Sequence, residues 1–206
     1  MTDLRECAGG ADRLVVIDTE TTGLYPTDRI VEVALVTLSL DGDVIDVFET
    51  LVQPGRDVSA SHIHGITAEM VVSAPTFVDI AGDVAVRLNG ACLVAHNLPF
   101  DFRMLDGEFG RIGRPLTMAD GVDTLRATGC RLHEACSMFG VPLTGAHRAS
   151  ADAAATSELL LRVTARCSPG SPAGAPSGLP RTGRVLRRND LAPVQLPDPP
   201  LIVYLA

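Results

Sequence analysis

A short run of apolar, mostly β-branched residues, Leu14–Ile17, is followed directly by two carboxylates, Asp18 and Glu20. Such a run predicts a buried β-strand, and on a strand the side chains of residues i and i+2 lie on the same face. The two carboxylates should therefore lie side by side where the strand ends. Neighbouring carboxylates repel each other unless a cation offsets their charge, and Mg²⁺ prefers oxygen ligands of this kind. Taken alone, the pair is better explained as two ordinary solvated residues at a strand end.

The next part of the chain predicts that the sheet begins with antiparallel strands. Residues 30–40 form an apolar and β-branched run that is broken by Glu32. Asp41-Gly42-Asp43 is a hairpin signal, and residues 44–52 return as another strand. We therefore expect three antiparallel strands at the start of the chain, with the carboxylate pair on the first.

Helices and short strands are expected to alternate along the chain up to residue 166. Helices are indicated by apolar residues at helical spacing or by strong helix formers, and central strands by short apolar runs. A short helix is expected to start at Ala68, with Thr67 as its cap. The other expected helices are about 77–88, about 100–109, 132–139 and a helix that opens at 147–152 and runs to about 166, and the expected strands are 91–95 and 122–125.

Further candidate residues lie near the starts of two of these helices. Asp101 and Asp152 fall in their first turns, and His147 lies on the loop before the last helix. Alone, Asp101 is explained as a carboxylate that interacts favourably with a helix dipole. Together with Asp18 and Glu20, however, these residues make four carboxylates that could converge at one edge of a sheet. Two Mg²⁺ ions about 4 Å apart would balance such a cluster and hold a phosphodiester. Histidines titrate near neutral pH, so His147 fits the role of general base.

The order of these motifs resembles that of one nuclease family. D-x-E-T-T-G at residues 18–23, H-N-x-x-F-D at 96–101 and H-R-A-x-x-D at 147–152 are similar to the motifs of the DEDDh group of DnaQ-like 3′–5′ exonucleases. Shorter phrases between them also look like the family's. The resemblance covers roughly residues 12–166. It implies an α/β, ribonuclease-H-like fold, in which a mixed five-stranded sheet with three antiparallel strands first is flanked by helices.

The resemblance also implies the cofactor and the catalytic residues. Two Mg²⁺ ions would be the cofactor, and Mn²⁺ could substitute. His147 would be the general base. The metal ligands would be Asp18, Glu20, Asp101 and Asp152.

A second set of residues is implied to contact or support the terminal nucleotide. An aromatic ring at position 100 suits this role because stacking tolerates any base. The set consists of Thr21, Thr22 and Leu24 as contacts, His64 and Phe100 as residues that help to hold the nucleotide, and Asn97 as a support of the site.

The resemblance also implies the activity. The expected reaction is hydrolysis of single-stranded or frayed DNA from its 3′ end, with release of nucleoside 5′-monophosphates, in proofreading or repair.

The motifs are also compatible with other functions. The motifs do not separate DNA from RNA, so an RNA 3′-end-trimming exoribonuclease is an alternative, because that choice depends on contacts to the 2′-hydroxyl. The protein could also be a polymerase-binding subunit whose catalysis is secondary, or a phosphohydrolase of free nucleotides. His62 and His64 form an H-x-H pattern, but no nearby cysteine or further histidine supports a metal site there.

Composition and charge limit the class of protein. The formal net charge is −8, which counts against a protein that coats nucleic acid through a broad basic surface but not against an enzyme that binds a few nucleotides. No stretch of eighteen apolar residues occurs, and the first dozen residues contain no apolar run like that of a signal peptide. We therefore expect a cytoplasmic protein with no membrane partner.

The composition changes sharply after residue 166. Residues 168–178 are rich in Ser, Pro, Gly and Ala, residues 181–188 include four arginines, and residues 201–205 are apolar. We expect an exonuclease domain at 1–166 and a tail at 167–206. The tail suits a tether to a DNA polymerase, a sliding clamp or a nucleic acid strand. Alternatively, its apolar end packs on the domain as an edge strand.

Overall fold

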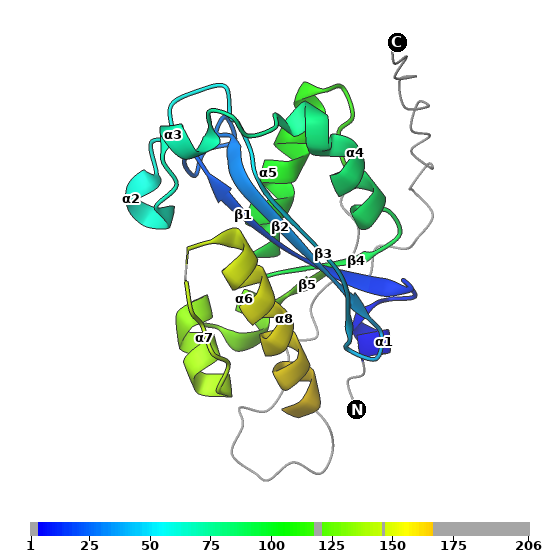
Figure 1. Cartoon of the computed structure of the whole chain (residues 1–206). Helices are drawn as coiled ribbons and strands as arrows, with labels where there is room; N and C mark the ends of the chain where they lie inside the picture. Colours follow the sequence, from blue (N-terminus) through cyan, green and yellow to red (C-terminus); the bar gives the residue numbers. More distant parts are fainter. Residues whose placement is uncertain (1–3, 118–120, 146, 167–206) are drawn as a thin grey trace, which may run out of the picture.

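The strands of the described residues form one mixed sheet of five in the order β3-β2-β1-β4-β5 (Figure 1). The computed structural model describes residues 4–117, 121–145 and 147–166. Neighbouring strands are antiparallel from β1 to β3, and β4 runs parallel to both β1 and β5. The predicted sheet with three antiparallel strands first is confirmed. The strands are β1 (Arg13–Thr21), β2 (Ile30–Ser39), β3 (Val44–Leu51), β4 (Cys92–Ala95) and β5 (Gly121–Asp123).

Strand β1 is longer than its apolar run. Leu14–Ile17 are fully buried, but pairing with β2 continues to Thr21, which lies opposite Ile30. The sequence had indicated that Asp18 and Glu20 lie where the strand ends, but Asp18 lies well within β1 and Glu20 is the residue before its last. The reason is that backbone pairing, which any residue can make, extends a strand beyond the residues that supply its buried side chains.

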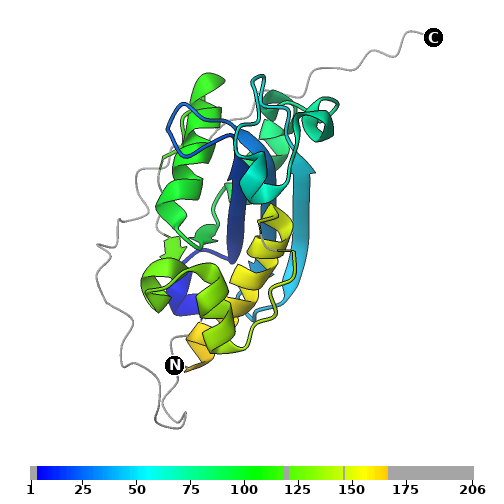
Figure 2. The same cartoon turned by 90° about the vertical axis from the view of Figure 1, so that its left-hand side faces the viewer.

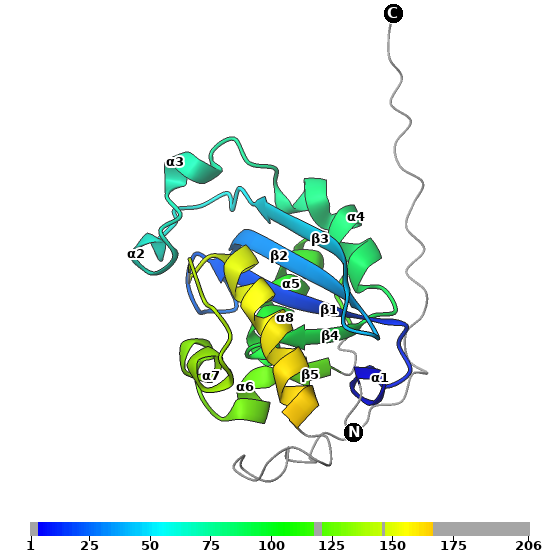
Figure 3. The same cartoon turned by 60° about the horizontal axis from the view of Figure 1, so that its bottom comes forward.

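Helices cover both faces of the sheet, as Figures 2 and 3 show. One core cluster joins Val15 and Ile17 of β1 to helices α4 (Phe77–Leu88) and α5 (Leu98–Arg111). A second cluster joins the intervening β1 residues to α8 (Ala149–Arg166). Alternate side chains of β1 thus face different layers, as the period of a strand requires.

The remaining helices are short or peripheral. Helix α7 (Leu132–Phe139) packs on α8 through a third apolar cluster. Helix α3 starts at Ala68 as predicted, with Thr67 at the N-cap position but without a side-chain capping bond. Within the described ranges, no helix is both long and apolar enough to cross a membrane. The short helices are α1 (Leu4–Cys7), α2 (Ser61–His64), α3 (Ala68–Val71) and α6 (Thr124–Thr128).

Candidate active site

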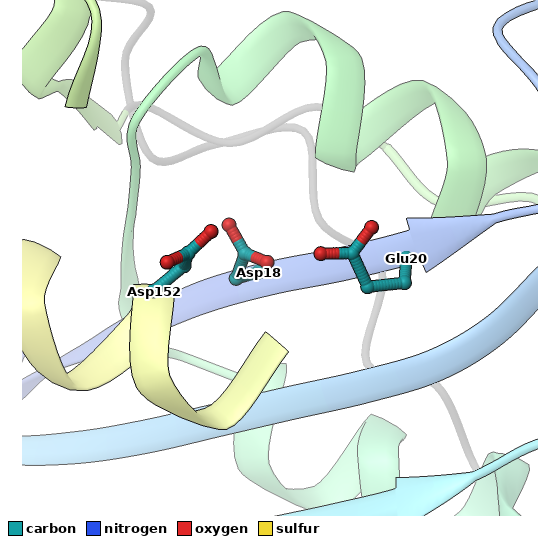
Figure 4. A group of neighbouring side chains, drawn as sticks. All are labelled: Asp18, Glu20 and Asp152. Carbon is teal, nitrogen blue, oxygen red and sulfur yellow. The ribbon is translucent and has the colours of Figure 1, made fainter. Parts of the chain in front are cut away.

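Three carboxylates from two elements meet on the α8 face of the sheet. Asp18 and Glu20 come from β1, and Asp152 comes from the first turn of α8. One ligand oxygen from each lies within 4.8 Å of the other two. Figure 4 shows the carboxylates of Asp18 and Asp152 directed toward each other, with Glu20 further along β1. The sheet therefore brings together residues that are more than 130 positions apart in the sequence.

Asp101 lies next to this group but makes a contact of its own. It is buried in the first turn of α5, and one of its carboxylate oxygens accepts a hydrogen bond of 2.8 Å from the hydroxyl of Thr19. Its negative charge helps to raise the pKa of Asp18. The structure thus places three of the four predicted carboxylates together and the fourth beside them.

Burial and the nearness of other carboxylates raise the pKa values of the carboxyl groups in this site. Burial raises the pKa of Asp18 well above its usual value, and the charges of Asp101, Asp152 and Glu20 raise it further. Burial, followed by neighbouring carboxylates, raises the pKa of Glu20 to about 8. The pKa of Asp101 rises to about 7, chiefly through burial. Such shifts mark groups that would ionise fully beside a cation.

An unpaired oxygen at the same place supports a cation site. Among the described residues, Oδ1 of Asp152 is buried and has no hydrogen-bond partner. A buried carboxylate oxygen without a partner is unfavourable, and a hard divalent cation is a partner that would satisfy it. The carboxylate-only ligand set and the unpaired oxygen both fit a divalent cation of the Mg²⁺ type.

His147 lies at the entrance to α8, beside the carboxylates. Its side chain is exposed, and its backbone adopts φ +66°, a left-handed conformation that non-glycine residues rarely adopt. Its backbone N–H donates a hydrogen bond of 3.2 Å to Oδ2 of Asp152, and this bond lowers the pKa of that carboxyl against the larger effect of burial. The predicted general base and a predicted metal ligand are therefore linked directly.

Glu32 and Arg148 are part of this arrangement and were not among the predicted site residues. Nε of Arg148 lies 3.0 and 3.1 Å from the two carboxylate oxygens of Glu32. The backbone N–H of Ala149 donates to Oε2 of the same carboxylate at 2.8 Å. The sequence carried one signal for Glu32, because a charged residue interrupts an otherwise apolar strand.

The loop between β1 and β2 presents two apolar side chains to solvent. Leu24 is 68% exposed and Tyr25 is 75% exposed. Asp28 holds the loop in shape, since its carboxylate accepts hydrogen bonds from the Thr22 hydroxyl and from the backbone N–H of Tyr25, both at 2.9 Å. Arg103 of α5 also donates to the backbone oxygen of Leu24. An apolar tip on a well-anchored loop suits contact with a nucleotide base.

Thr21 and His64, which were also predicted to contact or hold the nucleotide, form hydrogen bonds with the backbone at the start of this loop. The hydroxyl of Thr21 donates to the backbone oxygen of Gly23 at 2.7 Å. The Nδ1 atom of His64 accepts from the N–H of Ile66, so Nε2 carries the proton and donates to the Thr21 oxygen at 3.2 Å. Burial also lowers the pKa of His64, which favours this neutral form. Both ring nitrogens are thus occupied, which disfavours an H-x-H metal site. Contact of His64 with a nucleotide stays a prediction.

Asn97 and Phe100 lie at the start of α5. Asn97 is the N-cap residue with φ +95°, and its N–H donates to Oδ1 of Asp123 at 3.1 Å. Phe100 is partly buried, and the Arg103 guanidinium lies 5.3 Å from its ring centroid. Asn97 therefore fixes the entry of the helix that carries Asp101, and its support of a bound nucleotide stays a prediction.

Comparison with known proteins identifies the family. The family model named RNase T, which describes an exonuclease, matches residues 15–160. The chain belongs to this exonuclease family. The match includes every predicted carboxylate and His147, and it confirms the family that the motifs indicated.

Two relatives show how much of the chain such proteins share. This chain is 35% identical to the DNA polymerase III subunit epsilon of Treponema pallidum over 161 residues, which cover 72% of this chain and 74% of that protein. It is 37% identical to a DNA polymerase III subunit epsilon-like protein of Rhodobacter capsulatus over 163 residues. That match covers 72% of this chain but only 23% of the relative, and matches to PolC-type DNA polymerase III proteins cover 11–12% of their length.

Solved structures confirm the fold. Exonuclease X in complex with 5′ overhanging duplex DNA is 28% identical, with a TM-score of 0.60, and the alignment covers 74% of this chain and 91% of that one. Exonuclease I is 20% identical with a TM-score of 0.67, covering 75% of this chain and 41% of that one. The similarity to Exonuclease I supports only the fold of this chain. Both agree with the predicted ribonuclease-H-like architecture.

Proposed function

We propose that this protein is a 3′–5′ exonuclease that hydrolyses single-stranded or frayed DNA from its 3′ end and releases nucleoside 5′-monophosphates. The observation that carries the proposal is the group formed by Asp18, Glu20 and Asp152, whose ligand oxygens lie within 4.8 Å of one another. Membership of the exonuclease family supports the reaction type. Proofreading or repair is the role that such a reaction would serve.

The four carboxylates would hold two divalent cations, Mg²⁺ in the first place and Mn²⁺ as a substitute. Bound cations of this kind supply the positive charge that phosphodiester hydrolysis requires at the attacking and leaving oxygens. Asp18, Glu20 and Asp152 would ligate from one side, and Asp101 would complete the set from α5. Among the described residues, the unpaired oxygen of Asp152 supports this assignment.

The chain's own residues would supply the proton transfer and hold the substrate. His147 would accept the proton of the attacking water, since its exposed ring lies on the loop that is bonded to Asp152. Leu24 and Tyr25 would contact the bases near the 3′ end, and Phe100 would stack on the terminal base. This mode of binding depends little on base identity.

DNA is favoured as the substrate by the most informative relatives. The chain is more than 30% identical to proteins named as DNA polymerase III components, and Exonuclease X was solved with duplex DNA that has a 5′ overhang. A DNA polymerase or sliding clamp that binds the tail at 167–206 would be the partner. The tail lies outside the described residues, so its role stays a prediction, as does a cytoplasmic location.

The experiment compares single-stranded DNA and RNA of the same sequence, each labelled at its 5′ end, with Mg²⁺ present. We expect a ladder of products that shortens from the 3′ end of DNA and is absent with EDTA or with Asp18→Ala or Asp152→Ala. A ladder on RNA alone would overturn the DNA assignment. Hydrolysis of free nucleotides without shortening of either polymer would overturn the exonuclease proposal.

A second variant tests the proposed base. His147→Ala should lower the turnover number about 10²- to 10⁴-fold, the usual contribution of a general base, and leave metal affinity unchanged. His133→Ala, at an exposed histidine of α7, is the matched control and should have no effect. Loss of metal affinity in His147→Ala would contradict the assignment of His147 as a base.

A further inference from the structure

Glu32 is a buried charge that the exonuclease motifs do not contain. Its side chain is only 3% exposed, and its partner across the β1–β2 ladder is Glu20. Directly opposed residues of antiparallel strands direct their side chains to the same face, so Glu32 lies on the α8 face together with Glu20. A buried carboxylate is strongly unfavourable unless it is paired and hydrogen-bonded.

The partners of Glu32 are the two residues that follow His147. The guanidinium of Arg148 donates through Nε and Nη2, and the backbone N–H of Ala149 donates to Oε2 at 2.8 Å. The guanidinium is planar and presents its donors in a fixed fork, so this pairing restrains orientation as well as distance. The last bond also satisfies one of the free N–H groups at the start of α8.

His147 is therefore restrained from both sides. Its left-handed backbone, with φ +66°, is a conformation that persists in non-glycine residues only when the surroundings impose it. On one side its N–H is bonded to Asp152. On the other side the next two residues are bonded to Glu32.

From these contacts we infer that Glu32 is a positioning residue that holds His147 in its place beside the carboxylates by fixing Arg148 and the first residue of α8. Glu32 is not one of the three carboxylates whose ligand oxygens come together. The inference rests on the proposed exonuclease function, because it assigns Glu32 a part in the same reaction through the base.

The first test is a double-mutant cycle in the DNA assay. Glu32→Ala should lower kcat at least 10-fold with KM changed less than about twofold, and it should cause no further loss in a His147→Ala background, because both changes remove the same contribution. Glu49→Ala is the matched control, since Glu49 is an exposed glutamate near Arg148, and kcat should be unchanged. An equal loss from Glu32→Ala in both backgrounds would overturn the inference.

The second test does not depend on activity. In the metal-free protein, Glu32→Ala should speed amide hydrogen exchange of His147 and Ala149 at least 10-fold, while amides in the middle of β1 keep their rates. If Glu32→Ala does not fold, Glu32→Gln, which keeps one acceptor, should give smaller changes in the same amides. Unchanged exchange would overturn the inference. A wild-type protein without exonuclease activity would overturn the proposed function, and exchange would still decide whether Glu32 holds the loop.

Discussion

Glu20 and Asp18 have higher pKa values in the folded protein than in an unfolded chain. A group with a raised folded pKa stabilises the fold while it is protonated, and this stabilisation is lost as the pH rises through the folded pKa, about 8 for Glu20 and higher than usual for Asp18. His64 and His96 have lowered pKa values, so their protonation changes the stability of the fold only at pH values below about 6.5.

We therefore predict that the melting temperature of the metal-free protein falls as the pH rises from about 7 to about 9. The measurement is a thermal melt in EDTA at several pH values. Added Mg²⁺ should raise the melting temperature and remove most of the pH dependence, because a bound cation favours the ionised carboxylates. A melting temperature that stays constant or rises over this range would contradict the account of the carboxylate group.

Among single residues, the sequence identified the charged residues of the motifs but not Glu32 and Arg148, which pack beside them. Asp18, Glu20 and Asp152 could be named because two carboxylates at i and i+2 and a recognisable order of motifs carry their chemistry. Glu32 could not be assigned, since its partners Arg148 and Ala149 are more than 110 residues away in the sequence. Its burial shows only when β2 and α8 are packed together.

Gly23 is the residue on which the shape of the β1–β2 loop depends. A Cβ atom placed there would lie 2.5 Å from Oδ2 of Asp28, and that carboxylate cannot move away without losing its bonds to Thr22 and Tyr25. Gly23 therefore leaves room for the carboxylate that anchors the exposed tip formed by Leu24 and Tyr25.

We predict that Gly23→Ala destabilises the protein by about 1–3 kcal/mol and raises KM for DNA several-fold with a smaller effect on kcat. Thermal melting and steady-state kinetics measure the two effects. Gly82→Ala in α4 is the control, because an added Cβ would meet no described atom within 4 Å apart from the neighbouring backbone of its own helix, and alanine favours a helix by about 0.5–1 kcal/mol. An unchanged KM in Gly23→Ala would argue against a substrate-binding role of the loop.

Helices and strands could be predicted best where the pattern of apolar residues extends over many positions. Strands β2 and β3 and helices α4, α5, α7 and α8 were placed to within a few residues. The four-residue helices α1 and α2 were not expected, because so few residues cannot show a helical period. The end of β1 was placed too early, since pairing with β2 carries the strand through two charged positions.

At the scale of the whole molecule, the apolar clusters of the described residues are formed by elements between Leu4 and Arg166. The proposed division of the chain at residue 166 therefore makes a direct prediction. A protein truncated after Arg166 should fold with nearly the same melting temperature and hydrolyse short DNA oligomers at a similar rate. Loss of folding on truncation would contradict the division and favour a tail that packs on the domain.

The whole fold could be predicted only in part from local patterns. Periodicity gives strands and helices, but the order β3-β2-β1-β4-β5 follows from pairings between distant segments. The family resemblance implied a mixed sheet of five strands with three antiparallel strands first, but not this order. The same holds for the site. Asp18 and Asp152 meet because α8 packs on the face of the sheet to which the even-numbered β1 residues point.

If these carboxylates hold the cations of an exonuclease, the number of Mn²⁺ ions that the protein binds depends on them. Isothermal titration of the wild-type protein with Mn²⁺, in the presence of thymidine 5′-monophosphate as the proposed product, should give two ions per chain. Asp18→Ala should bind neither with measurable affinity, and His133→Ala should bind both. Absence of Mn²⁺ binding by the folded wild-type protein, or equal binding by Asp18→Ala, would show that these carboxylates do not form the cation site.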